Sequence, residues 1–144
     1  MGITNLIKLI QEAKSKGRIV FVCGNGGSAS NAEHFTNDLF KNNVRAMCLN
    51  SNVSQMTMIA NDYGYESIFS MPLAVFSSPG DLLITISCSG TSKNILKVQE
   101  AAKLFRVQIV NFPVFKTKKK YTFREYGLLE DKHLQIIHKV AAAI

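Results

Sequence analysis

The chain has 144 residues, of which 47% are hydrophobic and 19% are charged, and its formal net charge is +7 at pH 7. This composition excludes a wholly disordered chain and predicts one folded domain, residues 1–144, with a hydrophobic core. No apolar run is long enough to span a membrane, and Met1 to Asn5 lacks the pattern of a signal peptide, so we expect a cytoplasmic protein. The sharpest basic cluster, Lys116 to Lys120, is short, and we expect an anionic small molecule rather than nucleic acid or a membrane as partner.

Helical and apolar strand-like patterns alternate along the chain. In chain order we expect helix 3–16, strand 18–23, helix 28–41, strand 44–49, helix 54–61 capped by Ser54, helix 65–77 interrupted in pattern by Pro72, strand 82–86, helix 94–105, strand 107–111 and helix 130–144. Residues 112–127 lack a clear period, and a short fifth strand is expected at 121–123. The nearly all-apolar strands indicate an α/β three-layer sandwich, a parallel sheet of four or five strands flanked by helices.

Three cysteines, Cys23, Cys48 and Cys88, are an odd number without the spacing of a metal site. Cys23 and Cys48 fall in apolar strand-like runs. We therefore expect reduced, buried thiols.

A glycine-rich turn, Cys23 to Ser28, joins the first expected strand to the second expected helix. Gly24, Gly26 and Gly27 permit positive φ and carry no side chains that would block a ligand. The helix that follows presents unpaired N–H groups and the positive end of its dipole. The turn therefore suits a phosphate.

A second turn of the same design, Ser87 to Ser92, follows the strand at 82–86 and contains three serines and a threonine. Their hydroxyls could bind phosphate oxygens, or they could simply cap the next helix. Two such turns at the carboxyl ends of parallel strands favour a shared anionic ligand. Neither turn matches a dinucleotide or ATP motif.

Four segments together resemble one known family, the sugar isomerase (SIS) domain. They are GNGGSASNAEHFTNDL (Gly24 to Leu39), Asn61-Asp62, ISCSGTSKNILK (Ile86 to Lys97) and EDKHLQIIH (Glu130 to His138). Within that family the chain is most similar to bacterial phosphoheptose isomerases, which convert sedoheptulose 7-phosphate to D-glycero-D-manno-heptose 7-phosphate through an enediol. The resemblance implies a flavodoxin-like fold, shortened here at the N-terminus and after the fourth strand, one zinc ion per active site, and a homotetramer.

The resemblance also implies roles for individual residues. It implies substrate contacts from Asn25, Gly26, Gly27, Ser28, Asn61, Asp62 and Glu130, phosphate contacts from Ser87, Cys88, Ser89 and Ser92, zinc ligation by His34, Asp38, Glu130 and His138, and catalysis by Asp38 and His138. Three of these positions depart from the family pattern, which has glutamate at 38, glutamine at 130 and often threonine at 88.

The spacing of these groups carries information of its own. His34 and Asp38 stand four apart, which places them on one helix face as an acid/base or metal pair, or as an ordinary exposed pair. Glu130 and His138 are about 12 Å apart along an ideal helix, so a shared metal requires Glu130 at a frayed helix start. The donor set suits zinc, with iron, manganese or nickel as alternatives. His133 is expected in the core or an interface.

Asn61 and Asp62 are expected in a loop, where an Asx turn before Gly64 and contacts to sugar hydroxyls are both compatible. A second function stays open beside the isomerase. It is a non-catalytic SIS module, either a phosphosugar sensor or a protein-binding relative of the factor that engages the bacterial replication initiator. The presence of His34, Asp38 and His138 favours the enzyme.

Overall fold

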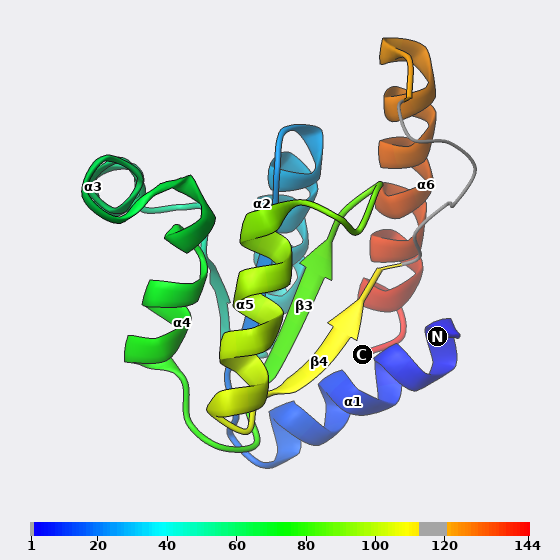
Figure 1. Cartoon of the computed structure of the whole chain (residues 1–144). Coiled ribbons are helices and arrows are strands. Elements are labelled where there is room, and N and C mark those ends of the chain that lie inside the picture. Colours follow the sequence, from blue (N-terminus) through cyan, green and yellow to red (C-terminus); the bar gives the residue numbers. More distant parts are fainter. Residues whose placement is uncertain (1, 113–120) are drawn as a thin grey trace.

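A computed structural model describes residues 2–112 and 121–144, so the basic cluster Lys116 to Lys120 lies outside the described residues (Figure 1). The elements are α1 (Ile3–Ser15), β1 (Val20–Gly24), α2 (Gly27–Lys41), β2 (Ala46–Cys48), α3 (Val53–Tyr63), the 3-10 helix η1 (Tyr65–Ser67), α4 (Ser70–Phe76), β3 (Leu82–Ile86), α5 (Lys93–Leu104), β4 (Gln108–Asn111) and α6 (Phe123–Ala141). Among them, no helix is both long and apolar enough to cross a membrane.

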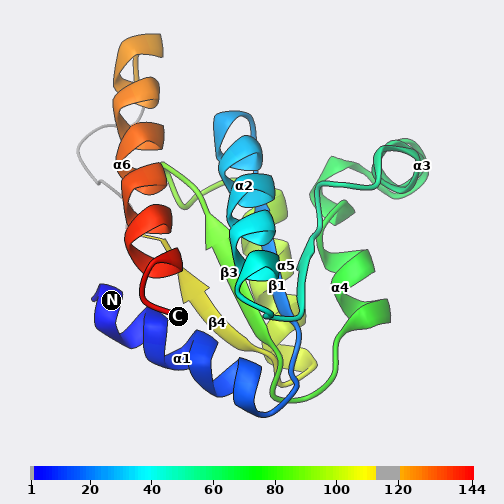
Figure 2. The ribbon, with the colours of Figure 1, turned by 180° about the vertical axis from the view of Figure 1, so that it is seen from behind.

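The four described strands form one parallel sheet in the order β2-β1-β3-β4. Val22 pairs with Cys48 on one side and with Ile84 on the other, and Gly24 pairs with Ile86 at the carboxyl ends of β1 and β3. Helices α1, α2 and α6 cover one face of this sheet, and α3, α4 and α5 cover the other (Figures 1 and 2). The expected α/β three-layer architecture is confirmed.

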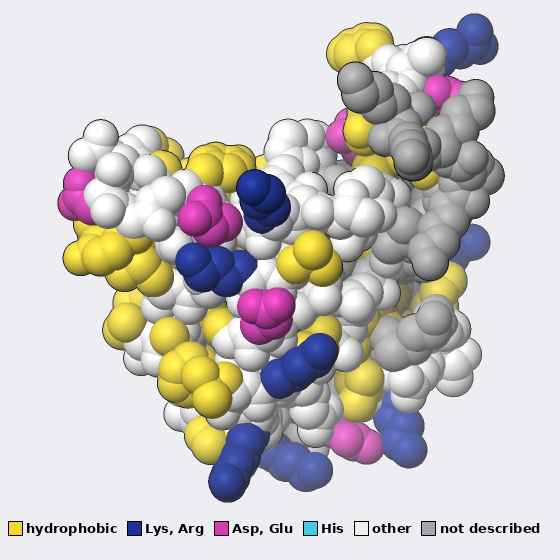
Figure 3. All heavy atoms as spheres, in the orientation of Figure 1, with side chains coloured by type: hydrophobic (Ala, Val, Ile, Leu, Met, Phe, Trp, Pro, Cys, Tyr) yellow, Lys and Arg dark blue, Asp and Glu magenta, His cyan; other side chains and the backbone are white. Residues whose placement is uncertain are grey.

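Hydrophobic side chains also gather on the outer surface of α3 and α4 (Figure 3). Val53 is 66% exposed, Tyr63 is 59% exposed and Val75 is 75% exposed. These helices therefore bury only part of their apolar surface within the chain.

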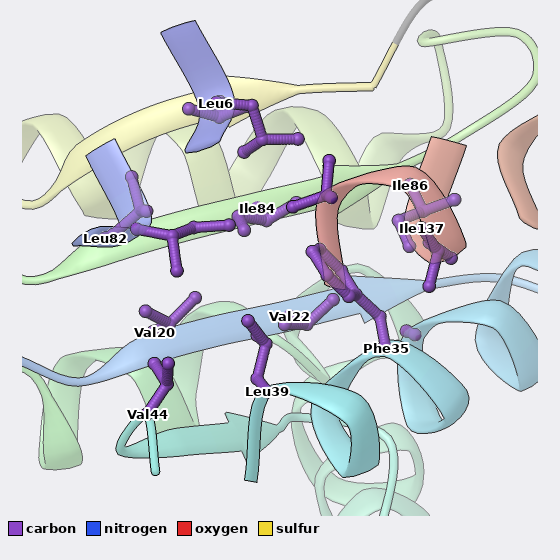
Figure 4. Close-up of a cluster of buried hydrophobic side chains, with 14 of the residues drawn as sticks. Leu6, Val20, Val22, Phe35, Leu39, Val44, Leu82, Ile84, Ile86 and Ile137 are labelled. Carbon is purple, nitrogen blue, oxygen red and sulfur yellow. The ribbon is translucent and has the colours of Figure 1, made fainter. Parts of the chain in front are cut away.

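The core follows from the alternation of side chains along β1. Val20 and Val22 point to the α1–α2–α6 face, where Phe35 and Ile137 join them (Figure 4), whereas Phe21 lies in the cluster on the opposite face. All five residues of β1 and all five of β3 are buried. Burial on both faces explains why these strands read as nearly continuous apolar runs.

The fifth strand expected at 121–123 is wrong, because this segment begins the last helix. Thr122 accepts a hydrogen bond from the backbone N–H of Glu125, and the Glu125 carboxylate accepts one from the backbone N–H of Thr122 at 2.7 Å. This capping box satisfies two N–H groups that a helix end otherwise leaves unpaired. Helix α6 therefore starts at Phe123, seven residues before the expected start.

The expected helices at 54–61 and 65–77 are also corrected. Asn52 rather than Ser54 caps α3, since its side chain accepts from the N–H of Gln55 at 3.0 Å. The second segment divides into η1 and α4, and Pro72 stands in the first turn of α4, where a missing N–H costs no helical hydrogen bond. Cys23, Cys48 and Cys88 are free and buried, as expected.

Candidate functional site

The two predicted phosphate loops meet at one pocket, at the carboxyl ends of β1 and β3. Its volume is about 320 Å³, and it is lined by Asn25, Gly26, Ser28, Ser87, Cys88, Ser89, Ser92, Tyr126 and Glu130. The N-termini of α2 and α5 both open onto it. Two helix ends with unpaired N–H groups and positive dipole ends make this pocket suitable for an anion.

Each glycine of the first loop has a different structural reason. A Cβ at Gly24 would lie 2.5 Å from the carbonyl oxygen of Ser28 and 2.8 Å from that of Ile86, so a side chain does not fit between the strand ends. Gly26 has φ +58° and ψ −129°, a conformation that L side chains rarely adopt. A Cβ at Gly27 would overlap the carboxylate of Glu130. The glycine expected to make room for a ligand thus makes room for a side chain of this chain.

A pair of amides ties the two loops together. Asn25 donates to the side-chain oxygen of Asn94 at 2.9 Å, and Asn94 donates back to Asn25 at 2.8 Å. Tyr65 also donates to Asn25, at 3.3 Å, and the Ser28 hydroxyl lies 3.9 Å from the sulfur of Cys88. Sequence reasoning missed Asn94, because only the sheet order brings it beside Asn25.

A second amide missed from the sequence supports the end of β1. Asn50 follows β2 and accepts from the N–H of Gly24 at 3.2 Å while it donates to the Gly24 carbonyl at 2.8 Å. The Asn50 amide pairs with the backbone N–H and carbonyl of Gly24 in the way that a neighbouring strand would. It fixes the position at which the first loop leaves the sheet.

The hydroxyls of the second loop are not helix caps. Ser87 accepts from the N–H of Gly90 at 3.0 Å, and Ser89 accepts from the N–H and the hydroxyl of Thr91 at 3.3 and 3.2 Å. Ser92 stands at the N-cap position of α5, yet its side chain makes no capping hydrogen bond. The first turn of α5 therefore keeps N–H groups directed toward the pocket.

A second polar group lies further along the line where α2 and α6 meet. The Nε2 atom of His34 is 3.2 Å from a carboxylate oxygen of Asp38 and 3.1 Å from Nε2 of His138. Two ring nitrogens this close need either a proton or a cation between them. The Asp38 side chain is only 13% exposed, and Lys41 contacts it at 3.5 Å.

The donor set and spacing of this group fit a zinc ion. Its three ligand atoms lie within 4.8 Å of one another. Ligands about 2.0–2.1 Å from a tetrahedral zinc are separated by roughly 3.3 Å, close to the two distances from His34, 3.2 Å to Asp38 and 3.1 Å to His138. Two imidazoles and a carboxylate are a set that zinc accepts. His34, Asp38 and His138 are therefore the residues able to hold a metal.

Glu130 does not join this group. The expectation of a frayed helix start at Glu130 is wrong, because the capping box at Thr122 keeps α6 helical through this position. Asn31 donates to the backbone carbonyl of Glu130 at 3.0 Å. The carboxylate of Glu130 lies against Gly27 in the pocket. The structure thus places Glu130 with the phosphate loops and about 12 Å along α6 from His138.

Three other predicted positions have clear locations. Asn61 and Asp62 lie in the last turn of α3, not in a loop, and are exposed and bonded to each other at 2.7 Å. Neither lines the pocket within the described chain. His133 is fully buried and packs edge to face on Phe112, with ring centroids 5.6 Å apart, which agrees with a core role.

One charged side chain lines the pocket among the described residues. Among the described lining residues, Glu130 is the one that is charged at neutral pH, and none is a cation. Burial raises the pKa of the Cys88 thiol, the nearby Glu130 carboxylate raises it further, and the Ser28 hydroxyl opposes this rise. Binding of an anion here therefore depends on the helix ends and hydroxyls.

The chain is similar to several known proteins. It is 45% identical over 101 residues to the phosphoheptose isomerase of Helicobacter pylori, and this match covers 66% of this chain and 52% of that protein. It is 41% identical over 100 residues to the phosphoheptose isomerase of Alteromonas mediterranea, and this match covers 65% of this chain and 50% of that protein. The chain spans about half the length of the curated relatives it matches.

Solved structures give the same likeness. A phosphoheptose isomerase from Francisella tularensis superposes with a TM-score of 0.86 at 27% identity, over 98% of this chain and 83% of that one. One from Neisseria gonorrhoeae shares the fold, with a TM-score of 0.86 at 24% identity over 97% and 83% of the two chains. The SIS domain model matches residues 1–112. With 112 of its 144 residues matched, the chain belongs to the SIS domain family.

Proposed function

We propose that this protein is an aldose–ketose isomerase that converts sedoheptulose 7-phosphate to D-glycero-D-manno-heptose 7-phosphate. The observation that carries the proposal is the placement of the anion pocket and the His34–Asp38–His138 group along the same pair of helices. The similarity to phosphoheptose isomerases over about two thirds of the chain supports the choice of substrate.

Helices α2 and α6 run side by side in the same direction (Figure 2), and polar contacts line their junction. Asn31 bonds to the Glu130 carbonyl near the pocket, His34 meets His138 further on, and Asn42 donates to the Ala141 carbonyl at the far end. From Gly27 to His34 the helix advances about 10 Å. An extended seven-carbon sugar whose phosphate is at one end and whose carbonyl is near the other suits two sites arranged in this way.

Isomerisation of a ketose requires removal of a proton from C1, delivery of a proton to C2, and a proton transfer between the two oxygens. The Asp38 carboxylate is our proposed base, since it is partly buried and held beside His34. His138 is the proposed acid that transfers the proton between the oxygens on C1 and C2. Both groups face the α2–α6 junction rather than the opposite face of the sheet.

We propose zinc as the cofactor, held by His34, Asp38 and His138. When bound, the ion would supply a Lewis acid that stabilises negative charge on the enediol oxygens. The geometry gives Glu130 no part in this ligand set, and its proposed role lies in the pocket.

We also propose a homo-oligomer, with a tetramer as the specific expectation from family resemblance. The exposed apolar side chains on α3, η1 and α4 support it, because apolar side chains gathered on one part of a surface are typical of an interface. Asn61 and Asp62, which lie away from the pocket of their own chain, are in the same region. Light scattering at micromolar concentration tests this, and a monomer would refute it.

Solvent exchange tests catalysis. With sedoheptulose 7-phosphate and zinc in D₂O, the wild-type protein should form an aldose that carries deuterium at C2, because the abstracted proton exchanges with solvent. Asp38→Asn should keep ligand binding and lose about 10²–10⁴-fold in turnover. Asn37→Ala, an exposed change on the same helix, is the matched control and should retain activity.

The same experiment separates the two candidate functions. Binding of the sugar phosphate without aldose formation, with zinc, manganese, iron or nickel, would refute the isomerase and favour a phosphosugar-binding SIS module. The absence of any sugar phosphate binding would refute both the isomerase and the phosphosugar sensor, and would favour the protein-binding form of the SIS module.

A further inference from the structure

Glu130 is an unusual group for a phosphate pocket. Anion sites commonly contain arginine or lysine, which pair with phosphate oxygens. Here the described lining residues carry no positive charge and one negative charge, the Glu130 carboxylate. The favourable field comes from the N-termini of α2 and α5, and Glu130 opposes it for any anion that enters.

The backbone that carries this carboxylate is held in place by its surroundings. It lies against the Cα of Gly27, the first residue of α2, where any larger residue would overlap it. The backbone of Glu130 is tied to α2 through Asn31, and the preceding residue, Leu129, is buried. Helix α2 has no acidic residue in its own first turn and no side-chain cap. Glu130 thus brings a negative charge from another helix to the end of α2.

The two helix ends that open on the pocket are therefore not equivalent. The end of α2 already faces a carboxylate, whereas the end of α5 faces the hydroxyls of Ser87, Ser89 and Ser92. A phosphate group is more stable at the α5 end, where hydroxyls donate to it and the like charge is further away. The rest of a bound sugar phosphate then lies toward Glu130.

We propose that Glu130 is a specificity-determining residue that selects a polyol phosphate over inorganic phosphate. The inference rests on the proposed sugar phosphate ligand. The carboxylate repels the phosphate group of either ligand, but a polyol chain also brings hydroxyl donors to the carboxylate oxygens. Hydrogen bonds to an ionised acceptor are about twice as strong as neutral ones, so these bonds offset the repulsion for the sugar phosphate alone.

Calorimetry with two ligands and two matched variants tests this selection. Inorganic phosphate and sedoheptulose 7-phosphate are titrated into wild type, Glu130→Gln and Asp131→Asn at constant pH and ionic strength. Glu130→Gln keeps the shape and hydrogen-bonding ability of the side chain and removes its charge. Asp131→Asn removes the same charge from the next residue of α6, which is exposed and does not line the pocket.

Glu130→Gln should bind inorganic phosphate about tenfold more tightly, because one like charge is removed near the anion in a half-buried site. Its affinity for the sugar phosphate should change much less, so the preference for the sugar phosphate falls. Asp131→Asn should change both affinities by less than about twofold, since its charge is exposed and screened.

Equal effects of the two variants on inorganic phosphate would overturn the inference, because they would reflect net charge only. Weaker binding of both ligands by Glu130→Gln would overturn it as well. Glu130→Asp, which keeps the charge on a shorter side chain, should remain selective, and loss of selectivity in that variant would contradict a role for charge.

The binding assays also separate this inference from the proposed isomerase. Selective binding without turnover would refute the isomerase and leave the role of Glu130 intact. Turnover with an unchanged preference in Glu130→Gln would refute the role of Glu130 alone. A wild-type protein that binds inorganic phosphate as tightly as the sugar phosphate would refute the inference directly.

Discussion

The amide pair between Asn25 and Asn94 is predicted to stabilise both the fold and the pocket, and Asn94→Ala tests this. The Asn94 side chain is 2% exposed and makes two reciprocal hydrogen bonds, of 2.9 and 2.8 Å, to Asn25. The substitution removes both bonds and leaves the amide of Asn25 with only the hydroxyl of Tyr65 as a partner in this group.

The expected loss follows from these contacts. A hydrogen bond of this kind contributes about 0.5–1.5 kcal/mol net, and the half-buried amide of Asn25 keeps Tyr65 as a partner. The loss of two bonds should therefore lower the free energy of unfolding by about 1–3 kcal/mol. Because the pair joins the two loops that line the pocket, affinity for sedoheptulose 7-phosphate should fall too.

Urea unfolding and calorimetry measure the two effects, and a double-mutant cycle with Asn25→Ala isolates the pair. The cycle should give a coupling energy above about 0.5 kcal/mol, since the residues are in direct contact. Asn37→Ala is the matched control and should stay within about 0.5 kcal/mol of wild type. Additive effects of the two substitutions, or an Asn94→Ala protein as stable as the control, would refute the assigned role of the pair.

Three further predictions concern other parts of the molecule. Asp81, which is 2% exposed and accepts from two backbone N–H groups at 2.9 and 2.7 Å, lies at the opposite end of the sheet, so Asp81→Ala should lower the free energy of unfolding by about 2–4 kcal/mol with ligand affinity unchanged. Phe35→Ala should cost about 3–5 kcal/mol in urea unfolding, because Phe35 is fully buried against Phe112. The raised pKa of Cys88 lowers its thiolate fraction at neutral pH, so its alkylation, followed by mass spectrometry, should be slow. The rate should continue to rise with pH beyond the point at which the alkylation rate of a free thiol becomes constant. Glu130→Gln should lower that pKa and speed the reaction at a given pH, and an unchanged rate would contradict the electrostatic contact.

The sheet and the two loops could be predicted from the sequence because their signals are local. The run Leu82 to Ile86 is apolar except for Thr85 and matches β3 residue for residue. The glycines and serines that follow β1 and β3 stand at strand ends, and parallel pairing alone brings such ends to one edge. The pocket was therefore predictable without knowledge of any side-chain contact.

The start of α6 was predictable in principle and was misjudged. Tyr121, Thr122 and Phe123 are residues typical of strands, but Thr122 and Glu125 have the spacing of a capping box, and the paired hydrogen bonds prevail over strand propensity. The error affected the site, because the position of Glu130 depends on where this helix begins.

Other parts of the site depend on contacts between distant segments. Asn94 and Asn50 each pair with the first loop through the arrangement of neighbouring strands, and a single sequence does not give that arrangement. The position of Glu130 against Gly27 likewise depends on how α6 packs on α2. The grouping of His34 with His138 was expected only through family resemblance, and its metal-binding role stays a prediction.

The site draws on two parts of the chain that differ in their construction. The two proposed phosphate loops belong to residues 1–112, the part that matches the family model, whereas Glu130 and His138 lie on α6. The latter helix is anchored in the core by Ile137 and Val140. Substitutions of Glu130 and His138 can therefore alter selectivity or chemistry while the backbone of the two loops stays unchanged. For protein engineering, libraries that vary the positions of Glu130 and His138 on this one helix can explore new substrates.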